Sequence, residues 1–255
     1  MSLTLKLALS PLLVAQALRT RARVPRLPEA SGARRGTVGT GALALRLLIV
    51  GDSSAAGVGV ASQRDALAGQ LARELAARLE GRVMWQLIAR SGITTAQALA
   101  LLDAEHIDAD HAPPADVAVL VTGVNDVVDQ VPSQRAMHAR ERLVNHLRNR
   151  SGVQHVVCCP LPPIHQFPAL PQPLRWVAGA DAQRHNRALA DWARHRAETL
   201  GDVSLPDFSD LRLNRGVMAH DGFHPGERAY RQVAHAVAMH IAAEVWPRLA
   251  HRPTR

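Results

Sequence analysis

The sequence predicts an α/β protein in which helices cover both faces of a parallel sheet. Short apolar runs recur from residue 45 onward, and Gly, Pro or Asp bounds each of them, which is typical of strands buried on both faces. Longer segments with apolar residues at helical spacing separate these runs. Strands that alternate with helices form parallel sheets, because right-handed crossovers place a helix over each strand pair.

The apolar runs predict five strands, at residues 45–50, 83–89, 117–122, 153–159 and 202–207. Helices are predicted between them and after the last, at residues 66–81, 133–150, 180–201 and 226–249. The first of these helices repeats leucine every four residues, from Leu67 to Leu79, which makes one apolar stripe. The chain contains no internal repeat and no second core, so residues 45–255 are expected to form one domain.

Residues 1–44 are expected to lie outside this domain, as an apolar segment followed by a basic linker. The apolar part, residues 3–18, is shorter than the ~20 residues that a membrane-spanning helix needs. Three interpretations stay open: a signal sequence cleaved near residues 15–17, a helix lying on anionic headgroups through residues 3–26, and a helix packed on the domain. The protein is accordingly expected in the cytoplasm or at a membrane, or beyond it after cleavage. Residues 19–42 are interpreted as a linker or surface wrap.

Composition argues against several other functions. The net charge is +8, but Lys6 is the only lysine and the arginines are scattered without a basic block interleaved with aromatics, so no nucleic acid is expected as a partner. Cys158 and Cys159 are adjacent in an apolar run, which favours packed side chains over a disulfide or metal site. Residues 106–111, HIDADH, are interpreted as a solvated turn because nothing else completes a metal shell, and no metal is expected.

Ser53 follows the first predicted strand, in the stretch GDSSAAGVG. A phosphate-binding loop would need a third glycine or a following lysine, and both are missing here. The small residues around Ser53 instead predict a turn that exposes its hydroxyl at a helix N-terminus, where developing negative charge is favoured. Ser53 is therefore the candidate nucleophile.

A serine needs a base, and DGFHPG offers Asp221 and His224 on one loop, three residues apart. The carboxylate would accept from Nδ1–H so that Nε2 faces Ser53. Candidate donors to an oxyanion are the Ser53 amide, the Gly92 amide and the Asn125 side chain. All of these follow strands or enter the last helix, so they should meet at the carboxyl edge of the sheet.

The set GDSSAAG, RSGITT, GVND and DGFHPG resembles, in order and spacing, the four signature blocks of the SGNH hydrolases, also called the GDSL esterase and lipase family. The resemblance covers about residues 45–246 and implies Ser53, Asp221 and His224 as the catalytic triad, with Gly92, Asn125 and the Ser53 amide as oxyanion donors. It also implies a flavodoxin-like three-layer α/β/α sandwich with strand order 2-1-3-4-5 and no metal or organic cofactor. The rival α/β-hydrolase motif G-x-S-x-G does not fit, because residue 55 is alanine.

The resemblance is nearest to bacterial acyl thioesterases and lysophospholipases, although Ile93 stands where those often have an acid. It implies a serine esterase acting on a small-molecule ester, thioester or lipid with a short to medium acyl chain. The alternative is a non-catalytic or membrane-associated binding protein on the same fold. The proline-rich residues 158–176 follow the fourth strand, so Phe167, Leu170 and Trp176 are expected to wall an acyl pocket; otherwise the segment is a surface crossover.

Overall fold

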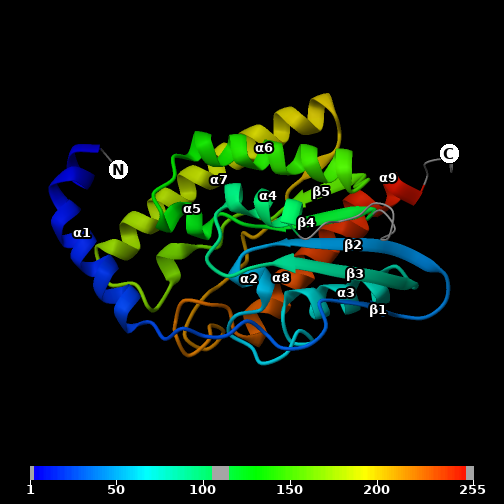
Figure 1. Ribbon diagram of the computed structural model, residues 1–255, viewed down its shortest axis with the longest axis horizontal. Helices are drawn as coiled ribbons and strands as arrows, with labels where there is room; N and C mark the ends of the chain where they lie inside the picture. The colour runs from blue at the N-terminus through cyan, green and yellow to red at the C-terminus, as the bar shows by residue number, and fades with distance from the viewer. Residues whose placement is uncertain (1–2, 105–114, 251–255) are drawn as a thin grey trace.

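The computed structural model describes residues 3–104 and 115–250, and these form a twisted sheet between two layers of helices (Figure 1). The strands are β1 (Arg35–Val38), β2 (Leu43–Gly51), β3 (Arg82–Ala89), β4 (Val117–Val121), β5 (His155–Cys158) and β6 (Val203–Ser204). Their order in the sheet is β1-β3-β2-β4-β5-β6. The strands from β2 to β6 pair in parallel in the predicted order, which confirms the α/β class.

The prediction of five strands was wrong by one. β1 pairs antiparallel with β3, from Arg35 opposite Gln86 to Val38 opposite Val83. It lies in the segment predicted to be a linker, before the predicted boundary at residue 45. β1 is an exposed edge strand, so it has no apolar run to mark it in the sequence. β6 is shorter than predicted, with two residues in the sheet.

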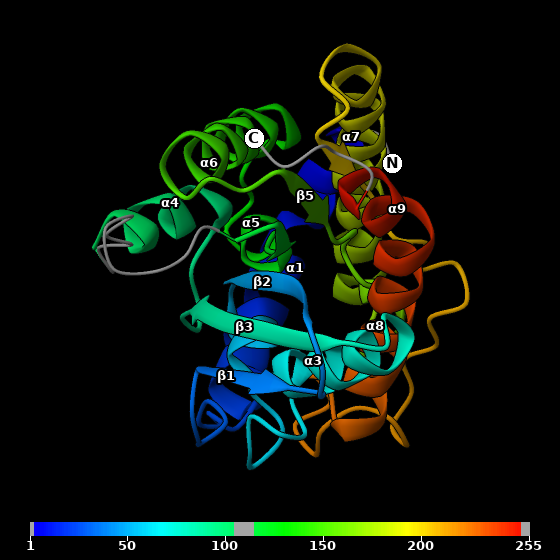
Figure 2. The ribbon, with the colours of Figure 1, turned by 90° about the vertical axis from the view of Figure 1, so that its right-hand side faces the viewer.

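The helices cover both faces of the sheet, and Figure 2 shows the two layers end on. They are α1 (Leu3–Arg23), α2 (Ser53–Ala56), α3 (Leu67–Arg78), α4 (Thr95–Ala104), α5 (Val124–Val128), α6 (Ser133–Arg150), α7 (Leu174–Thr199), α8 (Glu227–His240) and α9 (Trp246–Ala250), with a 3₁₀ turn η1 (Ile164–Gln166) and a π-helical turn η2 (Ile241–Val245). α3 and α8 pack on one face, whereas α4, α6 and α7 pack on the other. α7 begins six residues before its predicted start, residue 180, at Leu174.

The side chains of β2 show how the sheet is buried on both faces. Leu47 and Ile49 pack into the cluster under α3 and α8. Leu48 and Val50, which alternate with them, pack into the cluster under α4 and α6. Because side chains alternate across a strand, a run that is apolar at every position needs cover on both faces.

α1 touches the rest of the molecule at the beginning of α7. The Gln16 side chain donates to the Gln172 carbonyl (2.7 Å) and accepts from the Leu174 amide (3.1 Å). Leu13 of α1 is buried, whereas Leu18 is 64% exposed. In the described ranges 3–104 and 115–250, no helix has the length and apolar character needed to cross a membrane.

Candidate active site

The register of three strands brings the predicted site segments together. Gly51, the last residue of β2, lies opposite Ala89 of β3 on one side and Val121 of β4 on the other. The turns that follow these three strands contain Ser53, Gly92 and Asn125. They meet beside the neighbouring strands β2 and β4, from which the chain continues in opposite directions across the sheet, to β3 and to β5. Open α/β sheets bind ligands at such a point.

Ser53 is the first residue of α2 and lines a cavity at this edge. The carboxylate of Asp52 caps the helix by accepting from the Ser54 amide (2.9 Å). Gly51 allows the close packing that this turn requires: a Cβ at Gly51 would lie 2.4 Å from the Val121 carbonyl oxygen and 2.6 Å from the Ala55 Cβ. A larger residue at this position would push α2 away from β4.

Asp221 and His224 form the expected pair. Nδ1 of His224 lies 2.6 Å from Oδ2 of Asp221, and Oδ1 of Asp221 accepts from the amides of Phe223 and His224. Burial acts to raise the pKa of Asp221, but these hydrogen bonds outweigh it and hold the pKa below its ordinary value. The imidazole therefore has a charged, fixed partner. His224 lines the same cavity as Ser53.

The helix after this loop is tied to the nucleophile turn. Tyr230 of α8 is buried, and its hydroxyl donates to the Val58 carbonyl (2.7 Å). This bond joins residues 172 positions apart in sequence. Because the His224 loop leads into α8, this bond keeps that loop and the Ser53 turn together at the same cavity.

Gly92 and Asn125 lie at one junction. Gly92 has a φ of +81°, a left-handed conformation that favours glycine. Nδ2 of Asn125 donates to the Ile93 carbonyl (2.9 Å), which ties α5 to the turn that contains Gly92. A carboxamide nitrogen has two hydrogens, so this bond orients the side chain and leaves its second hydrogen for another acceptor.

Sequence reasoning missed a buried polar network behind this junction. The Thr95 hydroxyl donates to Oδ2 of Asp126 (2.5 Å) and lies 3.0 Å from the Thr122 hydroxyl. All three side chains are buried, and they join α4 to the turn after β4. Thr95 and Asp126 stand in the quoted stretches RSGITT and GVND, so the signal was present, but neither residue was given a role.

A cavity of about 70 Å³ lies beside Ser53 and His224. Phe167 lines it, as expected from the sequence, but Leu170 and Trp176 do not. Leu170 is buried in the adjoining apolar cluster. Trp176 is 48% exposed, and it lies on α7, which already begins at Leu174, rather than in a loop wall.

Much of the apolar wall comes from a segment that sequence reasoning did not assign. The apolar side chains at the cavity beside Phe167 include Leu161, Phe208, Leu211, Leu213, Met218 and Phe223. Residues 208–218 have no strand or helix, so periodicity did not mark them. Their position between a strand and the Asp221 loop was the available signal.

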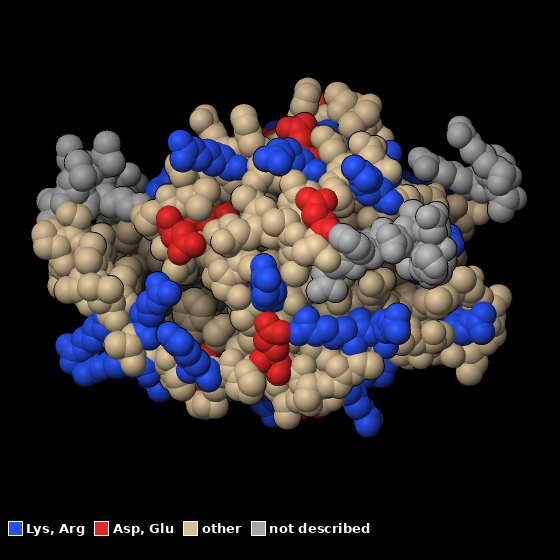
Figure 3. Space-filling model, viewed as in Figure 1, with Lys and Arg blue, Asp and Glu red and all other residues tan. Residues whose placement is uncertain are grey.

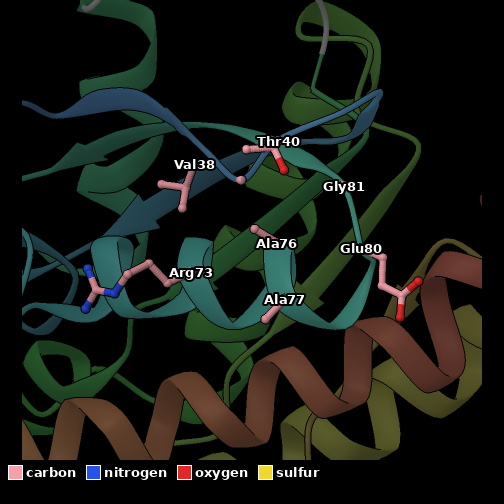
Figure 4. A pocket seen from close by; sticks show the side chains of 8 residues that line it. Val38, Thr40, Arg73, Ala76, Ala77, Glu80 and Gly81 are labelled. Carbon is pink, nitrogen blue, oxygen red and sulfur yellow. The ribbon is translucent and has the colours of Figure 1, made fainter.

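A second hollow lies between the end of β1 and α3 (Figure 4), and its lining includes Thr40, Arg73 and Glu80 but none of the predicted catalytic residues. Among the described residues, no group of three or more His, Cys, Asp or Glu side chains is placed to hold a metal ion. Residues 106–111, interpreted from sequence as a solvated turn, lie outside the described residues.

A serine at the end of a parallel strand, with a histidine–aspartate pair at the same cavity, is typical of serine hydrolases. Residues 49–232 match the model of the GDSL-like Lipase/Acylhydrolase family, and the chain belongs to this family. The resemblance found in the four sequence blocks is thereby confirmed.

Individual relatives agree with this assignment. A GDSL-like esterase of Mycobacterium tuberculosis is 30% identical over 193 residues, which are 74% of this chain and 59% of that protein. The chain thus spans about 59% of this relative's length. A lipase from a goat rumen metagenome superposes with a TM-score of 0.61 at 20% identity, over 78% of this chain and 97% of its own. A member of the lipolytic G-D-S-L family from Veillonella parvula gives 0.58 at 18% identity, over 81% and 100%. The two structures show a shared fold.

The ionisation of Asp52 makes the free energy of unfolding depend on pH. Burial raises the pKa of Asp52 to about 7, although the hydrogen bond from Ser54 opposes the shift. Between pH ~4 and ~7 the native protein keeps the proton that the unfolded chain releases, so the native state binds more protons. The free energy of unfolding therefore falls as the pH rises through this range.

We expect Asp52→Asn to flatten this pH dependence. The amide oxygen of asparagine still accepts from the Ser54 amide, but the side chain cannot ionise, so the variant should gain stability relative to the parent as the pH rises from ~4 to ~7. The gain should reach the order of 2–4 kcal/mol, since one pKa unit corresponds to about 1.4 kcal/mol. Urea unfolding at a series of pH values measures it. Parallel curves for parent and variant would contradict the raised pKa.

Proposed function

We propose that the protein hydrolyses carboxylic esters or thioesters through an acyl-enzyme on Ser53. The observation that carries this proposal is the His224–Asp221 pair, joined at 2.6 Å, beside the cavity that Ser53 lines. Membership of a lipase and acylhydrolase family supports the same reaction class. The geometry of the site and the family to which the chain belongs thus both support catalysis at this site.

In the proposed reaction, Oγ of Ser53 attacks the carbonyl carbon while Nε2 of His224 accepts the hydroxyl proton. The negative oxygen of the tetrahedral intermediate accepts hydrogen bonds from the amides of Ser53 and Gly92 and from Nδ2 of Asn125. The intermediate collapses, and the leaving alcohol or thiol takes the proton from His224. Asp221 stays ionised and stabilises the imidazolium.

Deacylation repeats these roles with water. The neutral imidazole of His224 removes a proton from water, and the hydroxide attacks the acyl carbon. Collapse of the second intermediate breaks the bond to Oγ of Ser53, which regains a proton from His224. The products are a carboxylic acid and free enzyme.

A serine elsewhere in the molecule lies beside two histidines and provides a rival for the nucleophile. Oγ of Ser204 lies 2.8 Å from Nε2 of His155 and 2.7 Å from Nε2 of His240. Burial lowers the pKa of His155 to about 4, which makes it a weak base. Ser204 is not among the residues that line the cavity beside His224. These observations favour Ser53.

Ser53→Ala should reduce turnover of p-nitrophenyl butyrate by at least about 10³-fold, because no other group would form the acyl intermediate. The circular dichroism spectrum and the denaturation midpoint should stay close to those of the parent. A fluorophosphonate should label the parent on the peptide with Ser53, as mass spectrometry would show. Turnover that persists in Ser53→Ala, or labelling at Ser204, would refute the assignment.

The cavity walls suggest which acyl groups fit. Aromatic and aliphatic side chains surround the space beside Ser53, so binding would rest on burial of the acyl chain. Each buried methylene is worth about 0.8 kcal/mol, or roughly fourfold in kcat/KM. We therefore propose that kcat/KM rises with chain length over short to medium acyl groups and stops rising where the wall is reached.

Phe167→Ala should move that limit to longer chains, because it removes a buried ring from the wall. Trp176→Ala is the matched control: it removes an aromatic ring from the same stretch of chain, but one that is exposed on α7. The measurement is kcat/KM for p-nitrophenyl esters of two to twelve carbons, below their micellar limits. The opposite result, a longer limit for Trp176→Ala and none for Phe167→Ala, would contradict the proposal and make Trp176 the wall residue in place of Phe167.

We also propose that the exposed face of α1 and the first turn of α7 contact a membrane surface with anionic headgroups. The large apolar residues exposed there are Leu12, Val14, Leu18 and Trp176. Exposed arginines follow at the end of α1, and Figure 3 shows basic side chains gathered at that end of the molecule. Exposed apolar residues followed by exposed arginines on one helix suit contact with an anionic headgroup surface. In Figure 1, α1 lies at the left-hand end of the molecule, beyond α5, which follows β4.

The full chain should therefore sediment with vesicles of phosphatidylglycerol and phosphatidylcholine, and much less with phosphatidylcholine alone. Leu18→Asp should weaken this binding several-fold, because it places a charge in the apolar contact. Leu200→Asp is the control, since Leu200 is also exposed but lies beyond the other end of α7. Equal weakening by both substitutions, or no binding to anionic vesicles, would rule out this surface.

A further inference from the structure

A short N-terminal segment contacts the turns that contain two of the proposed catalytic groups. We call residues 29–34 the strap; they lie between α1 and β1, before the region 49–232 that matches the family model. The strap comes from the part of the chain predicted to be a linker. Its contacts are specific, and they reach the nucleophile turn and the Gly92 turn separately.

The strap first holds the nucleophile turn through its backbone. The Ala30 amide donates to the Ala56 carbonyl (3.2 Å), and the Ser31 amide and hydroxyl both donate to the Ala61 carbonyl. The side chain of Gln63, itself buried, donates to the carbonyls of Ala30 and Ala56. Residues at the end of α2, three positions from Ser53, are thereby fixed to the strap.

The same strap holds the Gly92 turn through two side chains. Oε1 of Glu29 accepts from the Ser91 amide (2.7 Å), and Nη1 of Arg34 donates to the Ala89 carbonyl (2.6 Å). Glu29 and Arg34 also form an ion pair with each other. Although burial acts to raise the pKa of Glu29, the bonds from Ser91 and Arg34 hold it below its ordinary value, so the carboxylate is charged.

The Gly92 turn needs such support, because Ser91 and Gly92 are both exposed. Other bonds on this turn join the Arg90 amide to the Gly51 carbonyl (3.2 Å) and Asn125 to the Ile93 carbonyl. The Glu29 bond falls between them, on the residue directly before Gly92. A donor to an oxyanion contributes only if it is held in place before the reaction, and a displacement of about 1 Å can cost ~10²-fold in rate.

We propose that Glu29 is a positioning residue, which fixes the Gly92 amide relative to Ser53 by binding the Ser91 amide from the strap. This inference rests on the proposed function, in which the Gly92 amide donates to the oxyanion. The carboxylate touches no reacting atom in this scheme. It acts through the backbone, and Arg34 holds it in place.

The test measures kcat and KM for p-nitrophenyl butyrate in the full chain, together with Ki for a trifluoromethyl ketone, whose adduct with serine carries the oxyanion. Glu29→Ala should lower kcat by about tenfold, leave KM within about twofold, and raise Ki by about the same factor as the loss in kcat. Glu29→Gln keeps an oxygen that accepts from Ser91 and should retain most of kcat. Glu74→Ala is the matched control, because it removes an ion pair of similar exposure, with Arg78, on α3.

A fall in the denaturation midpoint with unchanged kcat and Ki would overturn the inference, since it would make Glu29 a structural residue only. Equal losses in Glu29→Gln and Glu29→Ala would also overturn it, because the bond to Ser91 would then be irrelevant. If Glu29→Ala does not fold, Glu29→Asp keeps the charge and shortens the side chain, and the same split between kcat and KM applies. Failure of the proposed function itself would appear separately, as turnover that persists in Ser53→Ala.

Discussion

The close approach of the backbone at Gly51 is the constraint on which the arrangement of the site depends. Here β2 ends between β3 and β4, and the amide of Asp52, the residue before α2, donates to the Val121 carbonyl (3.0 Å). The absence of a side chain lets the first turn of α2 sit directly on the strand ends. Ser53 is thereby brought level with the turns after β3 and β4. The cavity, the His224 loop and the Gly92 turn all gather around this point.

Three buried carboxylates lie around Gly51, and each accepts hydrogen bonds from a different set of donors. Asp221 accepts hydrogen bonds from an imidazole and two amides, which keep it charged. Asp126 accepts from Thr95, through both the hydroxyl and the amide. Asp52 has one amide donor, and burial raises its pKa instead. The pKa values of Asp221 and Asp52 are shifted in opposite directions, because their hydrogen-bond partners differ although both are buried.

The sequence predicted the parallel part of the sheet well, because a strand buried on both faces must be apolar at successive positions, as residues 45–50 are. It missed β1, whose exposed side chains need no such pattern. Asp221 and His224 could be paired from sequence because they lie three positions apart on one loop. The bond between Glu29 and Ser91 spans 62 residues, and no local pattern reports it. The prediction that Trp176 lines the cavity was wrong because α7 begins at Leu174, before the apolar stripe by which the helix was predicted from residue 180.

The loop that contains Asp221 and His224 holds the acid and the base in a fixed arrangement relative to each other. Their mutual bond and the two amide bonds to Asp221 all lie within residues 221–224, so the ring orientation is a local property of this loop. The separation from Ser53 is instead a long-range property, set by the packing of α8 and by the bond from Tyr230 to Val58. A small displacement of α8 would therefore change the distance between His224 and Ser53. It would not change which imidazole nitrogen of His224 carries the proton. Distance and tautomer are controlled by different parts of the molecule.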